Sequence, residues 1–289
     1  MIAKVWAWYR AVLVARKHCS NWAWLVIKSL LRARGRFRSR QGGSLSCDAR
    51  KLLKSLVRLE TTWRLNGDTL PIIKFENDHL VIPNYFGRDF RLPLDSADGV
   101  ASPSALLNKY PFSVAGEVVL DIGAWLGDTP LMWLYKGARS VIAVEPVPLH
   151  FSYLEKNTAG LPVICLKASL AVKLPYIQAA EGSNRYGLWD ASTDDFNTLD
   201  VPTIQLIELV ETYKPSVIKL NCEGCEHYVL EQLSMLPLFG VKKIAVEFHG
   251  IKGFNPYESI AFLEKKLGKG VIISDKYSQV RVVDVYWEF

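Results

Sequence analysis

Short apolar runs alternate with longer amphipathic stretches from about residue 117 to the C-terminus. The runs predict strands at 118–122, 140–144, 162–167, 217–220 and 243–248. The stretches predict helices at 128–136, 148–158, 203–213, 224–235 and 256–267. Residues 271–274 and 280–286 predict a closing antiparallel pair, because only a short turn separates them. Strands that are apolar on both faces and joined by helices indicate a doubly wound, mostly parallel α/β sheet, here with seven strands and a C-terminal antiparallel hairpin.

The chain before residue 116 follows a different pattern, which predicts two smaller parts. Residues 1–43 are expected to form a basic, Trp-rich helical arm, with helices at 3–18 and 21–34 and a linker at 41–44. The next part has helical patterns at 48–60 and 103–110 and short strand patterns between them. The predicted division is therefore an arm at 1–43, a small helix/β cap at 44–115 and an α/β core at 116–289.

Charge is distributed unevenly along the chain. The net charge is +6, but residues 1–47 hold ten of the 35 Lys and Arg residues and no acid. The other 242 residues therefore carry 25 basic against 29 acidic side chains. Specific nucleic-acid binding by the core is not expected, because such binding needs a basic surface.

The arm allows two interpretations. Its cations are interspersed with aromatic residues: Trp6, Trp8, Tyr9, Trp22 and Trp24. Trp side chains at a lipid boundary, with cations on acidic headgroups, would indicate peripheral membrane contact through residues 1–40. Alternatively, the arm is a helical cap packed on the body, with its Lys and Arg solvated. No run reaches the roughly 18–20 apolar residues that a membrane span requires.

The five cysteines are odd in number and irregularly spaced, and no secretory signal is evident, which predicts reduced thiols and a cytoplasmic location. Cys222 and Cys225 form a C-x-x-C sequence. A redox pair or half of a zinc site is one interpretation, but no second cysteine pair completes four ligands. The favoured interpretation is two small residues packed at a strand-to-helix turn. No metal site is predicted.

A glycine-rich segment, Asp121-Ile-Gly123-Ala124-Trp-Leu-Gly127-Asp128, follows the first core strand. Its glycines let the backbone turn sharply and approach a ligand, and the following helix begins with free N–H groups. Open sheets bind ligands at the carboxyl ends of such strands. Asp121 is expected to orient the ammonium group of a cofactor. The G-x-x-x-G spacing and the preceding acid disfavour a nicotinamide dinucleotide, whose fingerprint is G-x-G-x-x-G.

Glu145 ends the second core strand, directly before Pro146. A carboxylate at this place can accept both ribose hydroxyls of an adenosine. An N-cap or surface acid is the alternative role for Glu145. The acids on the two strands predict one cofactor lying across the strand tips, S-adenosylmethionine. The predicted cofactor-binding residues are Asp121, Gly123, Ala124, Gly127, Asp128, Glu145, Pro146 and Ala168.

Polar residues also end the fourth and fifth core strands, at the same edge of the sheet. A hydroxyl acceptor needs a base there, and His249 is expected to supply it with a pKa near neutrality. The alternatives are that Glu223 binds local backbone at the helix start and that His249 only packs. The predicted catalytic residues are Asn221, Glu223, Glu247 and His249.

Five segments in order, across about residues 117–250, resemble the FkbM-type methyltransferase family. They lie at 119–129, 138–146, 201–209, 218–226 and 244–249. The most diagnostic is Ile218-Lys-Leu-Asn-Cys-Glu-Gly-Cys-Glu226, which is similar to the family pattern I-K-[IM]-D-[VC]-E-G-x-E. The resemblance implies a Rossmann-like methyltransferase sheet, S-adenosylmethionine as cofactor and O-methylation of a hydroxyl. The acceptor would be a small molecule, a sugar, or a glycolipid or other lipid-linked glycan.

The chain departs from the family pattern in two places. Asn221 stands where the family usually has Asp, which leaves open a non-catalytic cofactor- or partner-binding module of the same fold. The family commonly has Asn or Tyr near Trp125, so the edge of the cofactor site differs here. Residues 175–200 are polar and loop-like, and are expected either to cover the substrate mouth or to form an ordinary hairpin excursion.

Overall fold

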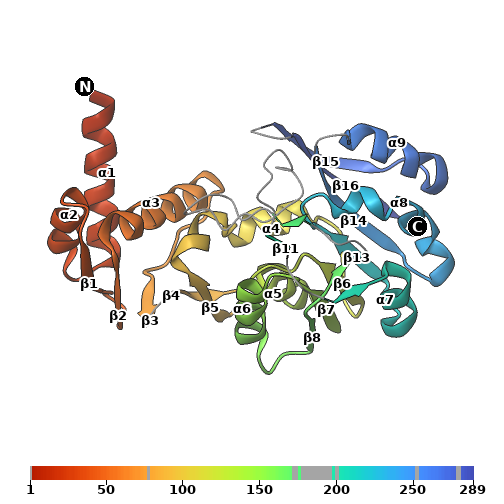
Figure 1. The fold of residues 1–289 in the computed structure, drawn as a ribbon, viewed down its shortest axis with the longest axis horizontal. Helices are drawn as coiled ribbons and strands as arrows, with labels where there is room; N and C mark the ends of the chain where they lie inside the picture. Colours follow the sequence, from red (N-terminus) through yellow and green to blue (C-terminus); the bar gives the residue numbers. More distant parts are fainter. Residues whose placement is uncertain are drawn as a thin grey trace. The chain divides into compact units, whose positions relative to one another are not determined.

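The computed structural model describes residues 2–76, 79–170, 175–176, 197–198, 202–250, 254–277 and 281–289. The chain divides into two compact units, Met1–Asn108 and Lys109–Phe289. Figure 1 shows the succession of helices and strands in each unit. The two units are described separately below.

A seven-stranded sheet forms the core of the second unit (Figure 1). Its strands are β6 (Val118–Ile122), β7 (Ser140–Val144), β8 (Val163–Leu166), β13 (Val217–Leu220), β14 (Lys243–His249), β15 (Val271–Tyr277) and β16 (Arg281–Glu288). The spatial order is β15-β16-β14-β13-β6-β7-β8. Strands β8, β7, β6, β13 and β14 pair in parallel, and β16 is antiparallel to both of its neighbours. The predicted mostly parallel sheet with a C-terminal hairpin is therefore confirmed.

Helices connect the strands of this sheet. They are α5 (Asp128–Tyr135), α6 (Pro148–Thr158), α7 (Leu206–Tyr213), α8 (Leu230–Met235) and α9 (Pro256–Leu267), with 3-10 turns η3 (Cys225–Tyr228) and η4 (Leu236–Phe239). The central strands β6 and β13 are buried at every position, as expected for strands covered on both faces. Their apolar side chains join one hydrophobic core with residues of β14 and β16. This core holds the carboxyl ends of β6, β7, β13 and β14 at one edge.

Two predicted helices are shorter than expected. The helix predicted at 203–213 begins at Leu206, because β12 (Thr203–Ile204) pairs in parallel with β9 (Ser169–Leu170). The helix predicted at 224–235 is divided into η3 and α8, because Val229 between them has φ −113° and ψ 15°, outside the helical region. The polar segment predicted at 175–200 lies largely outside the described residues. Within it, β10 (Pro175–Tyr176) and β11 (Asn197–Thr198) pair antiparallel.

The first unit combines helices with two small sheets. The helices are α1 (Ile2–His18), α2 (Trp22–Leu30), α3 (Ala49–Leu65) and α4 (Pro103–Lys109), which ends at the division, with the 3-10 turn η1 (Leu94–Gly99). One sheet contains β1 (Arg34–Arg38) and β2 (Ser44–Asp48), and the other contains β3 (Lys74–Glu76), β4 (His79–Tyr85) and β5 (Arg88–Pro93). Helix α3 contacts both α1 and α2 and buries Leu52, Leu56 and Leu59.

The predicted end of the second helix and the predicted linker were wrong. Residues 34–38 form β1, whose exposed Arg36 and Arg38 flank the fully buried Phe37. This alternation has the period of a strand and not of a helix. Residues 41–44 lie at the turn between β1 and β2, which pair from Arg34↔Asp48 to Arg38↔Ser44. The predicted boundary at 43/44 therefore falls inside a hairpin.

Candidate active site

The loops that follow β6 and β13 touch one another at the carboxyl edge of the sheet. Gly123, at the end of β6, has φ +76°, and a Cβ added there would lie 1.6 Å from the carbonyl oxygen of Asn221. Only glycine allows this approach. The N–H groups of Gly123 and Ala124 both donate to the carbonyl of Val144, each at 3.0 Å. The β6–α5 loop is therefore held between β7 and β13.

Asp121 is fully buried below this loop and contacts two side chains that the sequence did not single out. Its Oδ2 accepts a hydrogen bond of 2.9 Å from Trp133 Nε1, and its Oδ1 accepts one of 2.8 Å from Lys219 Nζ. Lys219 also donates to the carbonyls of Ile122 and Gly123, at 3.3 and 2.7 Å. This ion pair ties β13 to the start of the glycine-rich loop. The contact of Asp121 with a cofactor ammonium stays a prediction.

The sequence carries a signal for Lys219. It is the one charged residue in β13, a strand whose four residues are all buried. A lysine at such a position needs a buried partner, because burial of an unpaired charge is costly.

Glu145 is also buried, and its carboxylate accepts backbone N–H groups on two sides. Oε2 accepts from Trp125 and Oε1 accepts from Val147, each at 2.9 Å. Trp125 has φ +48°, a left-handed conformation that directs its N–H toward this carboxylate. An ionised carboxylate offers about four acceptor positions, so capacity remains for ribose hydroxyls. Glu145 therefore lies at the strand end as predicted, with its orientation determined by the backbone.

The remaining predicted cofactor residues lie around the same strand ends. Gly127 has φ +94° and precedes Asp128, the first residue of α5. Burial raises the pKa of the Asp128 carboxyl to about 6, an effect that Lys219 opposes and Asp121 reinforces. Pro146 follows Glu145 directly, and Ala168 is buried two residues after β8. The first turn of α5 thus carries a carboxyl that gains a proton more readily than usual.

On the acceptor side, His249 is the centre of a cluster of carboxylates. Its Nδ1 lies 2.7 Å from Oε1 of Glu226, which also accepts the His249 backbone N–H at 2.8 Å. Its Nε2 lies 3.2 Å from Glu247 Oε1 and 3.5 Å from Glu223 Oε2. Three of the four predicted catalytic residues, Glu223, Glu247 and His249, therefore lie together, and Glu226 joins them.

The pKa of His249 differs from the one expected of it. Burial disfavours the imidazolium, but the carboxylates of Glu223 and Glu226 outweigh burial and raise the pKa to about 9. The predicted pKa near neutrality was therefore wrong, because the turn after β13 brings the carboxylates of Glu223 and Glu226 beside the imidazole on β14. Lys109 extends the cluster, since its ammonium contacts Oε2 of Glu247 and lies 3.2 Å from Asp284.

Comparison with known proteins decides the family. The profile of the Methyltransferase FkbM domain matches residues 121–270, more than half of the chain. The chain belongs to the FkbM methyltransferase family. The match contains all four strand ends described above, and it confirms the resemblance found in the sequence. Among curated proteins, no sequence matches the chain.

Several solved structures are distantly similar to this FkbM-family protein. Trm5b from Pyrococcus abyssi is 16% identical with a TM-score of 0.42, over 75% of this chain and 57% of that one. The chain therefore spans little more than half the length of Trm5b. TYW2 from M. jannaschii in complex with AdoMet is 18% identical with a TM-score of 0.41, over 75% and 89%. Streptococcus pneumoniae Sp1610, a putative tRNA (m1A22) methyltransferase in complex with S-adenosyl-L-methionine, is 16% identical with a TM-score of 0.40, over 64% and 71%.

As a member of this family, the protein uses S-adenosylmethionine, which supplies an electrophilic methyl group on a sulfonium sulfur. Two buried oxygens fit a ligand at this place, one in the turn after β13 and one in the first turn of α5. Asn221 Oδ1 and Thr129 Oγ1 are each buried and find no hydrogen-bond partner among the described residues. Buried polar atoms are rarely left unpaired, so a polar ligand beside them accounts for both. Together with Glu145 and the close approach at Gly123, the residues present suit the cofactor.

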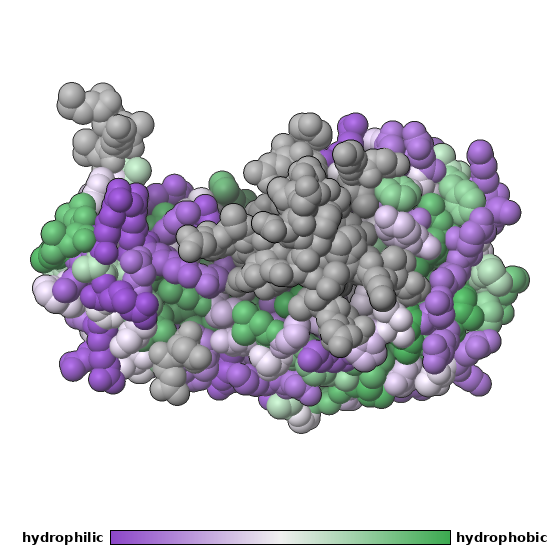
Figure 2. All heavy atoms as spheres, viewed as in Figure 1, coloured by the Kyte–Doolittle hydropathy of each residue, from purple (hydrophilic) through white to green (hydrophobic). Residues whose placement is uncertain are grey.

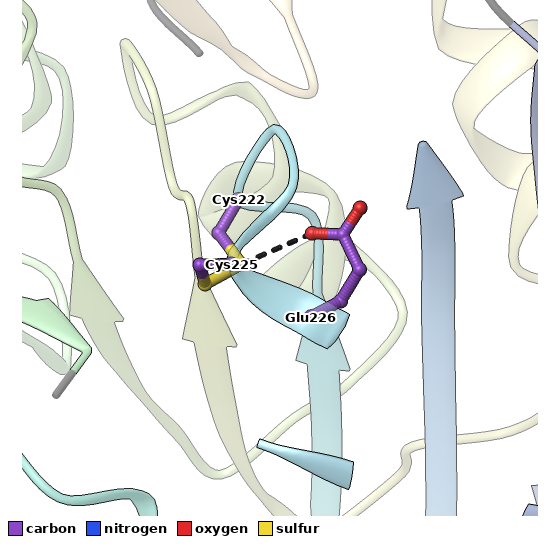
Figure 3. Close-up of side chains that lie close together, drawn as sticks. All are labelled: Cys222, Cys225 and Glu226. Atoms are coloured by element: carbon purple, nitrogen blue, oxygen red, sulfur yellow. Dashed lines mark hydrogen bonds between the residues drawn. A yellow bond between two sulfur atoms is a disulfide. The ribbon is translucent and has the colours of Figure 1, made fainter. Parts of the chain in front are cut away.

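The interpretation of Cys222 and Cys225 as packing residues was wrong, because the two form a disulfide (Figure 3). Their Cα atoms lie 5.4 Å apart across the turn after β13, within the range a disulfide can bridge. Figure 3 shows one oxygen of Glu226 facing Cys222, whose Sγ it contacts at 3.3 Å. The disulfide therefore braces the turn that carries Glu223 and Glu226. The reducing, cytoplasmic location stays a prediction.

Proposed function

We propose that the protein transfers the methyl group of S-adenosylmethionine to a hydroxyl of a small molecule, a sugar, or a glycolipid or other lipid-linked acceptor. The observation that carries the proposal is the contact between Gly123 and Asn221, where the cofactor loop meets the turn after β13. Glu223 follows on that turn. Its carboxylate lies 3.5 Å from His249 Nε2, and the carboxylate of Glu247 lies 3.2 Å from the same nitrogen. An acceptor bound beside this cluster would lie next to the cofactor loop.

The proposed chemistry depends mainly on position. An acceptor and a methyl donor bound side by side react faster than the same molecules in solution. Their proximity and alignment lower the activation free energy by up to about 7–11 kcal/mol. The proposed bases are Glu223, whose side chain is 44% exposed, and Glu247; His249 Nε2 lies within 3.5 Å of both carboxylates. Asn221 would orient the acceptor through its amide.

Calorimetric titration of the full chain tests the cofactor and the alternative dinucleotide in one experiment. We expect S-adenosylmethionine to bind and NADH to bind at least about 100-fold more weakly, a difference of about 2.7 kcal/mol. The reason is that the glycines after β6 are spaced G-x-x-x-G and not G-x-G-x-x-G, and that the acid Asp121 directly before them disfavours a pyrophosphate. Equal binding of NADH would contradict the site assignment.

Turnover then separates the two functions that Asn221 leaves open. Purified protein with methyl-labelled S-adenosylmethionine is offered hydroxyl acceptors, and label transfer supports the enzyme. Tight binding without transfer to any acceptor supports the non-catalytic module. The Asn221→Asp variant restores the usual family residue, so a gain of transfer in that variant alone would identify Asn221 as the cause.

We also propose that residues 1–40 contact acidic membranes at their surface. The exposed residues of α1, of α2 and directly after α2 include eight large apolar ones: Trp6, Trp8, Tyr9, Leu13, Trp24, Ile27, Leu30 and Leu31. Figure 2 shows apolar side chains of α2 as a green patch beside purple, hydrophilic ones. Alternate residues of β1, from Arg34 to Arg38, expose cations. Apolar side chains suit the lipid boundary, and cationic side chains suit acidic headgroups.

Among the described residues, no helix has the length and apolar character of a membrane span.

Vesicle flotation of full-length variants tests this contact. Replacing Trp6, Trp8 and Trp24 by alanine is expected to lower binding to phosphatidylserine vesicles at least about 10-fold, since each large apolar side chain buried contributes about 1.5–3 kcal/mol. The substitutions leave the fold intact because all three indoles are at least 42% exposed. Leu238→Ala, at an 83% exposed residue of the second unit, is the matched control. Equal flotation of the triple variant and the control would exclude the contact.

A further inference from the structure

Three side chains at the ends of β13 and β14 present ligand atoms that converge on one point. We propose that Glu223, Glu247 and His249 bind a divalent cation of the Mn²⁺ or Mg²⁺ class. The three ligand atoms, one per residue, lie within 4.8 Å of one another. The proposal concerns a metal site in its own right, and its role in methyl transfer rests on the proposed function.

The distances suit ligands around a metal better than direct ion pairs. His249 Nε2 lies 3.2 Å from Glu247 Oε1 and 3.5 Å from Glu223 Oε2. A charge-assisted hydrogen bond between imidazolium and carboxylate is shorter, about 2.7–2.9 Å. Ligand atoms that share a small divalent cation at about 2.0–2.2 Å are separated by roughly 3–3.5 Å. The observed separations lie in or near that range.

Glu226 holds the imidazole in the orientation that metal binding requires. Glu226 Oε1, on a fully buried carboxylate, is hydrogen-bonded both to His249 Nδ1 and to the backbone N–H of His249. The other oxygen accepts the N–H of Gly224 at 2.9 Å, so the carboxylate itself is immobilised. A histidine ligand characteristically donates its second ring N–H to a carboxylate in this way. With Nδ1 so engaged, Nε2 is the atom that faces Glu223 and Glu247, and a cation bound there takes the place of the Nε2 proton. The imidazole itself is buried.

Glu247 divides its two oxygens between two cations. Oε2 contacts the ammonium of Lys109, whereas Oε1 faces His249. Lys109 therefore leaves Oε1 available as a ligand and stabilises the charge of the carboxylate behind it. Glu223 is more exposed and adds a ligand from the turn that the Cys222–Cys225 disulfide braces.

The charge of the cluster also calls for a cation. Four carboxylates, Glu223, Glu226, Glu247 and Asp284, take part in the ion pairs described around His249 and Lys109. Lys109 is the one lysine in those ion pairs, and protonated His249 is their other cation. Glu226, Glu247 and Asp284 are largely buried, and a dication that takes the place of the Nε2 proton adds one positive charge beside them.

The ligand set indicates which metal fits and what it would do. Carboxylate oxygens favour Mg²⁺ and Mn²⁺, and one imidazole shifts the preference toward Mn²⁺. Three protein ligands leave the remaining coordination positions for water or for oxygens of an acceptor. Such a cation lowers the pKa of a coordinated hydroxyl, which favours the oxyanion that methyl transfer needs. A second cluster, Cys222, Cys225 and Glu226, is not proposed because its sulfurs are bonded to each other.

Titration of the full-length protein with MnCl₂, without S-adenosylmethionine, tests the site. Electron paramagnetic resonance of free Mn²⁺ is expected to report one bound ion per chain. Glu223→Gln removes one ligand oxygen at a half-exposed position, so folding is preserved, and is expected to weaken binding at least about 10-fold. Glu247→Gln and His249→Gln are expected to weaken it further. Glu258→Gln, on the exposed side of α9, is the matched control and is expected to bind Mn²⁺ like the unchanged protein.

The outcomes distinguish this proposal from the proposed function. No Mn²⁺ binding, or binding that Glu223→Gln and Glu247→Gln leave unchanged, overturns the metal site even if methyl transfer occurs. Site-specific Mn²⁺ binding supports it even if no hydroxyl acceptor is methylated, because the measurement uses neither cofactor nor acceptor. Glu226→Gln gives an independent check, since loss of the supporting carboxylate is expected to weaken Mn²⁺ about 10–100-fold without removing a ligand.

Discussion

Replacing Glu145 by alanine is expected to weaken S-adenosylmethionine binding about 100-fold, or about 2.7 kcal/mol. The carboxylate is buried at the end of β7, and the N–H groups of Trp125 and Val147 hold it from two sides. A carboxylate with a determined orientation binds ribose hydroxyls without losing further side-chain freedom. Hydrogen bonds to an ionised acceptor each contribute about 1.5–3 kcal/mol, so the loss of two accounts for the expected change.

The same substitution also removes two acceptors from backbone N–H groups, so folding must be measured beside binding. Calorimetry gives the dissociation constant, and thermal unfolding of the same sample shows whether the fold persists. Glu155→Ala, at an exposed position in α6, is the matched control and is expected to change neither quantity. A folded Glu145→Ala protein that binds S-adenosylmethionine as tightly as before would remove Glu145 from the cofactor site.

The fold of the core could be predicted closely because its central strands are short, mostly apolar runs. Strands at 118–122, 140–144 and 217–220 were predicted with their observed bounds. Each is a short apolar run between polar turns, a pattern that needs no knowledge of distant residues. Where the pattern was ambiguous, prediction was wrong. The second helix was predicted to run to residue 34 but ends at Leu30, and residues 34–38 form a strand that buries Phe37.

The positions of the site residues could be predicted, whereas their partners could not. Asp121 and Glu145 end neighbouring strands, and strand ends at one edge of a sheet meet by topology alone. The Lys219 partner of Asp121 is 98 residues away in sequence, so no local pattern reveals the pair. The pKa of His249 depends in the same way on Glu223 and Glu226, which the β13 turn brings beside β14. Ion pairs and pKa shifts between residues far apart in sequence can be derived only from the folded chain.

The ion pair between Lys219 and Asp121 gives the second large expected effect. Lys219→Met is expected to lower the free energy of unfolding by about 3–5 kcal/mol, because it leaves a buried carboxylate without its cation. Lys219 and Asp121 are 2% and 0% exposed, so water cannot replace the lost partner. Two carbonyls, of Ile122 and Gly123, lose a donor as well. Urea unfolding of the full chain measures the change, and Lys266→Met on the exposed side of α9 is expected to stay within about 0.5 kcal/mol.

A double variant decides whether the unpaired charge of Asp121 or the lost hydrogen bonds of the Lys219 ammonium cause the loss of stability. Asp121→Asn combined with Lys219→Met removes both charges and keeps an acceptor for Trp133 Nε1, which donates to Asp121 at 2.9 Å. If the unpaired charge is the cause, the double variant is more stable than Lys219→Met alone by about 1–3 kcal/mol. If it is no more stable, the three hydrogen bonds of the ammonium, and not its charge, hold β13 to the cofactor loop. In either case the effect arises where the Gly123 loop meets β13, so S-adenosylmethionine binding is expected to weaken together with stability.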